Sequence, residues 1–186
     1  MLKLQKQTGF TLVELLIVIV VIGILSAVSV TAFNGVQTKA RHAQLKTTVL
    51  AYAKAFELYA VEHGDLPPAD WQCIGLPDDY PAEDGFLENH CGNGDHRYYK
   101  DSLYSSTTMN LILPYMGEKL ITGRYAKGPT EYNGDVRGLL YDRHINTTNK
   151  AVIAFFVKGK NGCPIGDQVG YNLTYDSTRC YYRLSI

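Results

Sequence analysis

The sequence predicts an α+β protein in which one long N-terminal α-helix packs on a small antiparallel β-sheet. Three observations support this prediction. The chain has an apolar run, residues 10–33, that contains a single charged residue, Glu14. Residues 34–63 then continue without proline and with helical spacing of apolar residues. Short segments with strand character follow, most of them after residue 136.

Length and composition limit what the protein can be. The chain has 186 residues, enough for one ordinary domain, and its 18 basic and 18 acidic residues give a formal net charge of zero. Neither sign of charge dominates, so no specific nucleic acid is expected as a partner. The mean hydropathy of −0.12 excludes several membrane spans, and the 14 Tyr, 6 Phe and 1 Trp exclude a disordered chain.

Residues 10–33 are expected to cross a membrane. A helix of this length measures about 36 Å, which exceeds the roughly 30 Å hydrocarbon core of a bilayer. Lys3 and Lys6 precede the run, so its short end is expected in the cytoplasm and the rest of the chain outside. A plain membrane anchor is one alternative. A secretory signal cut after Val30-Thr31-Ala32 is another, but Glu14 is unfavourable in such a signal.

A specific signal lies at the head of the apolar run: Gly9-Phe10-Thr11-Leu12-Val13-Glu14. Together with the basic leader before it and the uninterrupted apolar helix after it, this segment resembles the type III signal of type IV pilins. The resemblance implies that a prepilin peptidase removes residues 1–9 by cutting after Gly9 and then methylates Phe10. It also implies that the subunits assemble through their apolar helices.

Glu14 is the candidate assembly residue. A carboxylate inside a membrane helix costs at least about 2.5–3.5 kcal/mol on insertion scales, so a function and a partner are expected for it. Cleavage after Gly9 creates a positive amine on Phe10, one helical turn from Glu14 in the same chain. The resemblance implies that the amine of a neighbouring subunit is the partner. A Glu14 that only reaches water at the cytoplasmic boundary is the alternative.

The helix is expected to continue through residues 34–63 as an amphipathic second half. Gly64 provides its C-terminal stop, with Pro67 and Pro68 shortly beyond. The apolar residues recur at steps of three and four: Leu45, Val49, Tyr52/Ala53, Phe56 and Tyr59/Ala60.

Residues 64–186 are expected to form a globular head. Residues 64–104 look like a long irregular loop, and Ser105–Met116 is expected to be a short helix capped by Ser106 or Thr107. An antiparallel meander of three or four strands should follow. Three strands are predicted by their residues: Arg137–Ile145, Ala151–Lys158 and Cys180–Ile186. A long helix, a variable loop and an antiparallel sheet form the pilin-like architecture, so the resemblance extends to the head at this level.

The head contains four cysteines, Cys73, Cys91, Cys163 and Cys180, which permit three pairings. Pairing nearest neighbours closes two loops of about 17–19 residues, each worth roughly 3 kcal/mol in the chain-entropy model. The resemblance supports the Cys163–Cys180 pair, because type IV pilins have a disulfide-bounded C-terminal region. A metal site from His90, Cys91 and His96 with Cys73 is the alternative, but its spacing matches no zinc module.

Neither a catalytic constellation nor a glycine-rich phosphate loop is recognisable, so no enzyme, cofactor or metal is expected. An acidic segment surrounds the first cysteine pair but lacks the D-x-[DN]-x-[DN]-G calcium pattern, and we interpret it as a solvated loop. It comprises Asp78, Asp79, Glu83, Asp84, Glu88, Asn89 and Asp95. Asn146 and Asn172 match the N-x-[ST] glycosylation pattern, which arises easily by chance.

The resemblance predicts a structural subunit of an extracellular type IV pilus filament that serves adhesion or motility. The expected partners are copies of the chain itself, the prepilin peptidase and the pilus assembly machinery in the membrane. The precursor is expected in the inner membrane with its head outside. A pseudopilin of type II secretion and a competence pilin for DNA uptake are the alternatives, since both share the features of residues 1–35. A single-span anchored binding module is an alternative of a different class.

Overall fold

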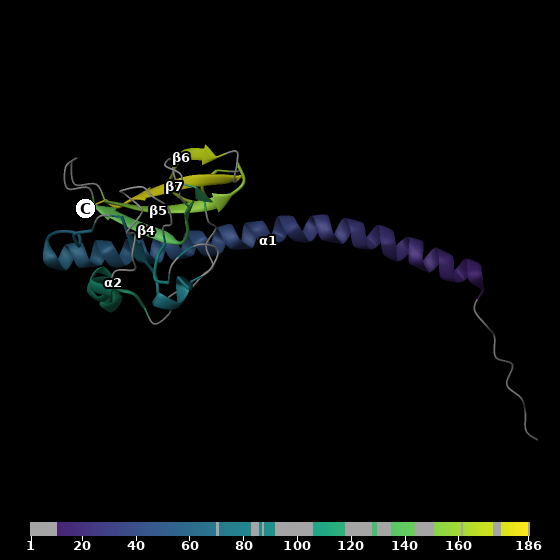
Figure 1. Cartoon of the computed structure of the whole chain (residues 1–186), viewed down its shortest axis with the longest axis horizontal. Helices are drawn as coiled ribbons and strands as arrows, with labels where there is room; N and C mark the ends of the chain where they lie inside the picture. The colour runs from purple at the N-terminus through teal and green to yellow at the C-terminus, as the bar shows by residue number, and fades with distance from the viewer. Residues whose placement is uncertain are drawn as a thin grey trace, which may run out of the picture. The chain divides into compact units, whose positions relative to one another are not determined.

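The computed structural model describes residues 11–69, 71–82, 86, 88–91, 106–117, 128–129, 135–143, 151–160, 162–172 and 176–185. The chain divides into two compact units, Met1–Arg41 and His42–Ile186. Helix α1 (Leu12–His63) begins in the first unit and ends in the second (Figure 1). The second unit, called the head below, also contains all the strands that the structure describes.

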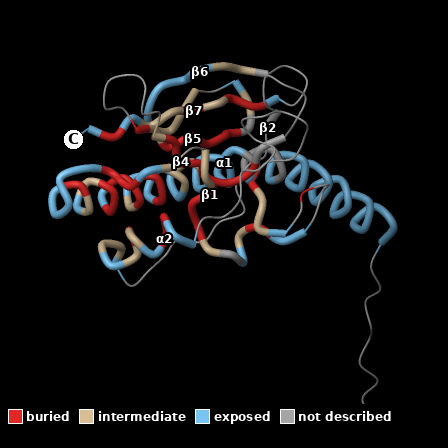
Figure 2. The backbone as a smooth tube through the Cα atoms, turned by 60° about the vertical axis from the view of Figure 1, so that its left-hand side comes forward, coloured by how far each residue is buried: buried red, intermediate tan, exposed pale blue. Residues whose placement is uncertain are grey.

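The part of α1 within the head carries the predicted apolar stripe. Its most buried apolar residues are each at most 4% exposed: Val49, Tyr52, Ala53, Ala55, Phe56 and Ala60. Figure 2 shows how buried and exposed positions alternate along this part of the helix. The helix ends at His63, and Gly64 follows with a φ of +79° and donates its N–H to the Ala60 carbonyl (2.8 Å). The predicted glycine stop is therefore confirmed.

A five-stranded antiparallel sheet packs on this stripe. Its strand order is β1-β4-β5-β7-β6, and the α+β class predicted from the sequence is confirmed. The strands are β1 (Gln72–Ile74), β4 (Leu139–Arg143), β5 (Ala151–Lys158), β6 (Asp167–Asn172) and β7 (Ser177–Arg183). In the register of the central strands, Ile153 lies between Tyr141 and Tyr182. Strands β2 (Gly128–Pro129) and β3 (Asp135–Val136) form a separate pair.

The predicted strands correspond to β4, β5 and β7, but two strands of the sheet were not predicted. Strand β1 and the 3-10 helix η1 (Pro77–Asp79) lie in the segment expected to be an irregular loop, so that expectation was wrong there. Three residues are too few to show the alternation that identifies a strand. Strand β6 contains a glycine and a register shift between Gln168 and Gly170, and both obscure its alternation.

The predicted helix at 105–116 is shorter than expected. The structure has helix α2 (Ser106–Ile112) followed by the 3-10 helix η2 (Leu113–Tyr115). Pro114 explains the change, because proline has no N–H to continue the α-helical hydrogen bonds. Tyr115 Oη in η2 donates to Glu62 Oε2 of α1 (2.5 Å), and this hydrogen bond raises the pKa of Tyr115 to about 12.

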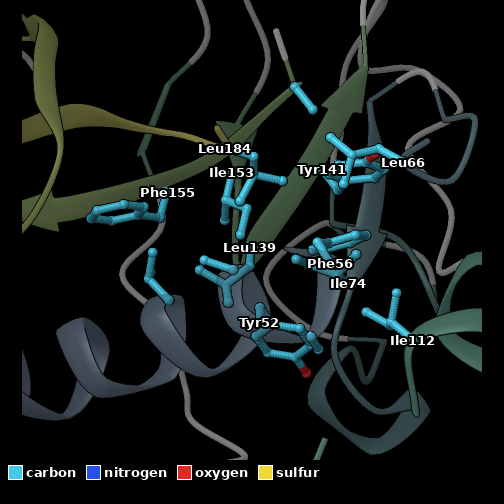
Figure 3. Close-up of a cluster of buried hydrophobic side chains, with 14 of the residues drawn as sticks. Tyr52, Phe56, Leu66, Ile74, Ile112, Leu139, Tyr141, Ile153, Phe155 and Leu184 are labelled. Carbon is cyan, nitrogen blue, oxygen red and sulfur yellow. The ribbon is translucent and has the colours of Figure 1, made fainter. Parts of the chain in front are cut away.

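The central strands of the sheet are buried on both faces, which explains why β5 is apolar throughout. One set of its residues, Ala151, Ile153, Phe155 and Val157, joins the main core with α1 (Figure 3). In that core the rings of Phe56 and Tyr141 stack with their centroids 4.1 Å apart. The alternate residues of β5, Ala154 and Phe156, join a second cluster with Cys73, Tyr80, Cys91 and Leu140.

Strand β4 also holds the chain that leaves α1. Arg143 Nη1 donates to the Leu66 carbonyl (2.5 Å), and Arg143 Nη2 forms a salt bridge with Asp65. Tyr141 Oη donates to the Pro67 carbonyl (2.8 Å). These contacts fix the turn after α1 against the sheet, so the helix end and the sheet depend on each other.

Gly138 cannot accept a side chain without displacing a buried tyrosine. Its φ is +81°, and a Cβ at this position would lie 2.6 Å from Cε1 and Oη of Tyr80. We expect Gly138→Ala to lower the free energy of unfolding by about 2–4 kcal/mol, through backbone strain and overpacking together. Denaturant unfolding of the chain in detergent micelles measures this value. Gly170→Ala is the matched control, because a Cβ there has no atom within 4 Å among the described residues; an equal cost for both variants would contradict the prediction.

Acid should weaken the turn held by Arg143. The hydrogen bond from Arg143 lowers the pKa of Asp65 below its ordinary value of 3.8. A carboxyl with a lower pKa in the folded state stabilises the fold above its unfolded pKa, and this stabilisation is lost as pH falls through the folded pKa. We expect the difference in Tm between wild type and Asp65→Asn to be constant above about pH 5 and to shrink below about pH 4. A difference that persists undiminished at about pH 2 would show that Asp65 acts through something other than its charge.

Candidate functional site

The first unit exposes an apolar helix. Within the described part of this unit, the large apolar side chains of α1 are between 48% (Val21) and 89% (Leu12) exposed. Leu12–Ser29 has a mean hydropathy of 2.8 and is long and apolar enough to cross a membrane. The Ser29 hydroxyl donates a hydrogen bond to the Leu25 carbonyl (2.7 Å). This bond satisfies the hydroxyl within the helix, so Ser29 is compatible with an apolar surrounding. This surface therefore needs either lipid or other protein to cover it.

Glu14 has a partner within its own chain. The Thr11 backbone N–H donates to Glu14 Oε2 (2.8 Å), and Thr11 Oγ1 donates to the same oxygen (2.7 Å). In return the Glu14 N–H donates to Thr11 Oγ1 (3.3 Å). Because α1 begins at Leu12, Thr11 is the N-cap and Glu14 is the third residue of the helix. This reciprocal arrangement is a capping box.

The capping box was missed in reasoning from the sequence, although its signal is present. Thr11-Leu12-Val13-Glu14 has the T-x-x-E spacing, and an apolar run follows it directly. From the sequence, Glu14 was expected to pair with an amine or to reach water at the cytoplasmic boundary, and its role as a helix cap was not predicted. Both hydrogen bonds from Thr11 go to Oε2. Within the part of the chain that the structure describes, Oε1 accepts no hydrogen bond, so this oxygen is available to another donor. Gly9 and Phe10 lie outside the described residues.

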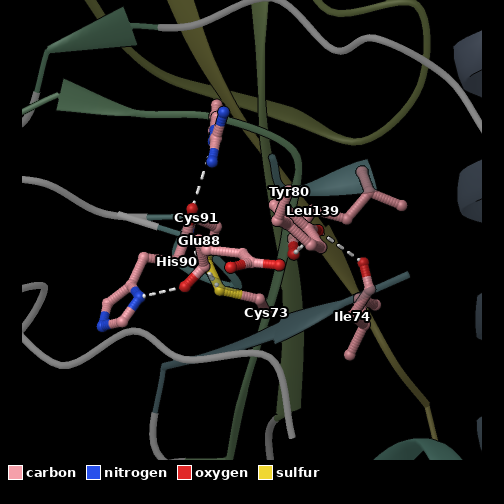
Figure 4. The surroundings of a disulfide bond; sticks show 8 residues. Cys73, Ile74, Tyr80, Glu88, His90, Cys91 and Leu139 are labelled. Atoms are coloured by element: carbon pink, nitrogen blue, oxygen red, sulfur yellow. Dashed lines mark hydrogen bonds between the residues drawn. A yellow bond between two sulfur atoms is a disulfide. The ribbon is translucent and has the colours of Figure 1, made fainter. Parts of the chain in front are cut away.

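The head contains two disulfides. Cys73 and Cys91 are bonded with an S–S distance of 2.02 Å, and Cys163 and Cys180 with 2.07 Å. These are the nearest-neighbour pairs among the three pairings that the sequence permits. Figure 4 shows the first disulfide beside Tyr80, whose Oη donates to the Ile74 carbonyl (2.8 Å). Cys73, Cys91 and Cys180 are fully buried.

The proposed metal alternatives gain no support from the described residues. Cys73 and Cys91 are bonded to each other, and His90 Nδ1 contacts the Glu88 carbonyl (2.7 Å). Asp79 Oδ2 accepts the Leu76 N–H (2.8 Å), while burial raises the pKa of Asp79. Among the described residues no group of three or more His, Cys, Asp or Glu side chains could hold a metal ion. Four of the metal candidates lie outside the described residues: Glu83, Asp84, Asp95 and His96. Of the two asparagines that match the glycosylation pattern, Asn146 lies outside the described residues and the side chain of Asn172 is not described.

Comparison with protein families identifies the N-terminal segment of the chain. The family model described as the prokaryotic N-terminal methylation motif matches residues 4–30, a range that includes Gly9, Phe10 and Glu14. The chain carries this methylation motif. The prepilin-type N-terminal motif that the sequence predicts is thereby confirmed.

The relatives are named as pilus and secretion proteins. The chain is 42% identical over 74 residues to prepilin peptidase-dependent protein D of Escherichia coli K12, covering 40% of this chain and 51% of that protein. It is 36% identical over 70 residues to type II secretion system core protein G of Vibrio cholerae, covering 38% and 48%. It is 40% identical over 66 residues to type IV narrow pilus major component PilA5 of Thermus thermophilus, covering 36% and 57%.

These similarities cover only part of each protein. The chain spans about half the length of the curated relatives it matches. No solved structure is significantly similar to the chain. The comparisons therefore show the N-terminal motif and a partial similarity to proteins named as type IV pilus and type II secretion components.

Proposed function

We propose that this chain is a structural subunit of an extracellular type IV pilus filament. The observation that carries the proposal is the position of the methylation motif, residues 4–30, at the start of α1, where the large apolar side chains that the structure describes are all exposed. In the proposed organisation, residues 1–9 are a cleaved leader and 10–33 the membrane and assembly segment. Residues 34–63 form the amphipathic half of the helix, and 64–186 complete the head. The relatives' names describe no enzyme, which supports a structural function.

In this proposal the exposed apolar surface of α1 has a different covering before and after assembly. Before assembly its apolar surface is covered by lipid, with the head outside the inner membrane. In the filament the same surface is covered by the helices of neighbouring copies. A contact between copies that does not close into a ring gives an open helical assembly, as a filament requires. A prepilin peptidase and assembly machinery in the membrane are the further partners in this proposal.

Glu14 guides assembly by accepting the Phe10 amine of an adjacent subunit. The capping box holds the carboxylate at the first turn of α1 through Oε2 and leaves Oε1 for the incoming amine. A charge-assisted hydrogen bond from an ammonium group to a carboxylate is stronger than a neutral one, particularly in an apolar surrounding. Each added subunit would then neutralise one amine and one carboxylate.

A pseudopilin of type II secretion is the second candidate. Its supporting observation is the similarity to type II secretion system core protein G of Vibrio cholerae. Deletion of the gene distinguishes the two candidates. Loss of surface filaments, adhesion and motility supports the pilus, whereas retention of secreted proteins in the cell supports the pseudopilin.

The first prediction of this proposal concerns processing. Mature protein should lack residues 1–9 and begin at N-methylated Phe10, because the peptidase cuts after Gly9. N-terminal mass analysis of protein from filaments or membranes measures this directly. Gly9→Leu should leave full-length precursor in the membrane, because a side chain obstructs access to the backbone. A mature N-terminus at Phe33 would instead establish secretory-signal cleavage.

The second prediction separates the charge of Glu14 from its helix-capping hydrogen bonds. Glu14→Gln retains an acceptor for the capping box but removes the charge, whereas Thr11→Val retains the charge but removes the Thr11 hydroxyl. Leaving a buried amine unpaired costs about 3–5 kcal/mol per subunit, and losing an N-cap side chain costs about 0.5–2 kcal/mol. We therefore expect Glu14→Gln and Glu14→Val to abolish filaments, and Thr11→Val to reduce them only partly.

The measurement is sheared filament yield relative to processed subunit in the membrane. Membrane level and cleavage after Gly9 should stay near normal in all three variants, since neither insertion nor cleavage needs the pair. Ser29→Ala is the matched control, because it removes a hydroxyl hydrogen bond from the same helix away from Glu14. Wild-type filament yield from Glu14→Gln would refute the charge pairing and leave Glu14 as a helix cap.

A further inference from the structure

One buried arginine binds the loop closed by the Cys73–Cys91 disulfide at two places, its middle and its end. Arg137 is 8% exposed and lies two residues before β4. Its Nη2 donates to the Pro81 carbonyl (2.6 Å), and its Nε donates to the His90 carbonyl (3.1 Å). Its backbone N–H donates to the Cys91 carbonyl (2.7 Å). A single residue therefore binds the middle and the end of the loop.

Aromatic side chains of the same loop enclose the guanidinium group. Arg137 Cζ lies 4.5 Å from the centroid of the Phe86 ring and 5.9 Å from that of Tyr80. Phe86 is 4% exposed and Tyr80 fully buried, so these cation–π contacts are shielded from water. The Asn89 N–H also donates to the Tyr80 carbonyl (2.8 Å). None of these contacts involves a sulfur atom.

The two cysteines are positioned by different parts of this framework. Cys73 lies on β1, paired in register with Leu140 of β4. The Cys91 carbonyl accepts a hydrogen bond from the backbone N–H of Arg137, and the Cys91 N–H donates to Cys73 Sγ (3.0 Å). Arg137 and β4 are adjacent in the chain, so the residue that holds Cys91 is connected directly to the strand that holds Cys73.

We propose that Arg137 closes this loop before oxidation and so selects Cys91 as the partner of Cys73 over the other two cysteines. The disulfide then locks a loop that is already in place. In the oxidation, two thiols lose two protons and two electrons to an oxidant of the disulfide class, which is reduced to two thiols. The inference concerns the head alone and holds whether the subunit belongs to a pilus or a pseudopilus.

The first test follows disulfide formation in the full-length chain. Reduced protein in detergent micelles is exposed to oxidised glutathione, and peptide mapping without reduction measures each disulfide over time. We compare wild type with Arg137→Met, which retains an apolar chain of similar length, and with Arg137→Lys, which cannot bind two carbonyls with a planar group. Each variant should form Cys73–Cys91 about tenfold more slowly, with mispaired species appearing, because the loop is no longer held by two hydrogen bonds from one guanidinium group.

Two controls show whether such an effect is specific. Cys163–Cys180 should form at the wild-type rate in the Arg137 variants, which shows that the rest of the head folds. Arg183→Met should leave both rates unchanged, because Arg183 is exposed and pairs with Asp167 on β6. Equal rates of Cys73–Cys91 formation in wild type and Arg137→Met overturn the proposal.

The second test removes the disulfide and leaves Arg137. In Cys73→Ser/Cys91→Ser, the Arg137 and Asn89 amides should stay protected from hydrogen exchange, because their hydrogen bonds do not involve sulfur. Protection of both amides within about tenfold of wild type supports a loop closed by Arg137. Exchange of both amides at the rate of an unfolded chain shows that the disulfide shapes the loop and overturns the proposal.

Discussion

The structure depends on one constraint: the two parts of helix α1 lie in different surroundings. The first part exposes its apolar side chains, and the second part packs on the sheet. Near the start of α1, the described apolar side chains are about half exposed or more. From Thr48 onward, one side of the same helix is buried under the sheet. Because the described residues of the first segment are exposed and add nothing to the core, the head has to be stable by itself. Its closed core, two disulfides and buried polar contacts meet that requirement.

Glu14 illustrates how a local interaction leaves part of one side chain for the assembly interaction that we propose. In the single subunit its carboxylate completes the N-terminal cap of α1 by accepting two hydrogen bonds from Thr11. This reduces the cost of placing a charge at the head of an apolar helix, since part of the carboxylate is already hydrogen-bonded. The remaining oxygen makes the same residue suited to an amine from another copy.

The head gains stability by burying the central strands of its sheet on both sides. Phe56, Tyr141 and Ile153 pack on the α1 side, where apolar area removed from water provides the main driving force. Leu140, Ala154 and Phe156 pack on the other side against the disulfide-bonded loop. A loop can cover a sheet in this way only if its own backbone groups are satisfied. Arg137 and Tyr80 supply hydrogen bonds to that backbone.

Local patterns were sufficient for the parts of this protein that depend on neighbouring residues. The signal Gly9–Glu14, the stripe on α1, the stop at Gly64 and strand β5 could all be predicted, because helix periodicity, capping and apolar runs are short-range properties. The T-x-x-E cap was also readable from the sequence. Strands β1 and β6, the role of Arg137 and the position of Tyr80 against Gly138 were not. Each depends on residues distant in the chain, such as Cys73 opposite Leu140 or Arg137 beside Pro81, and only the folded chain brings these together.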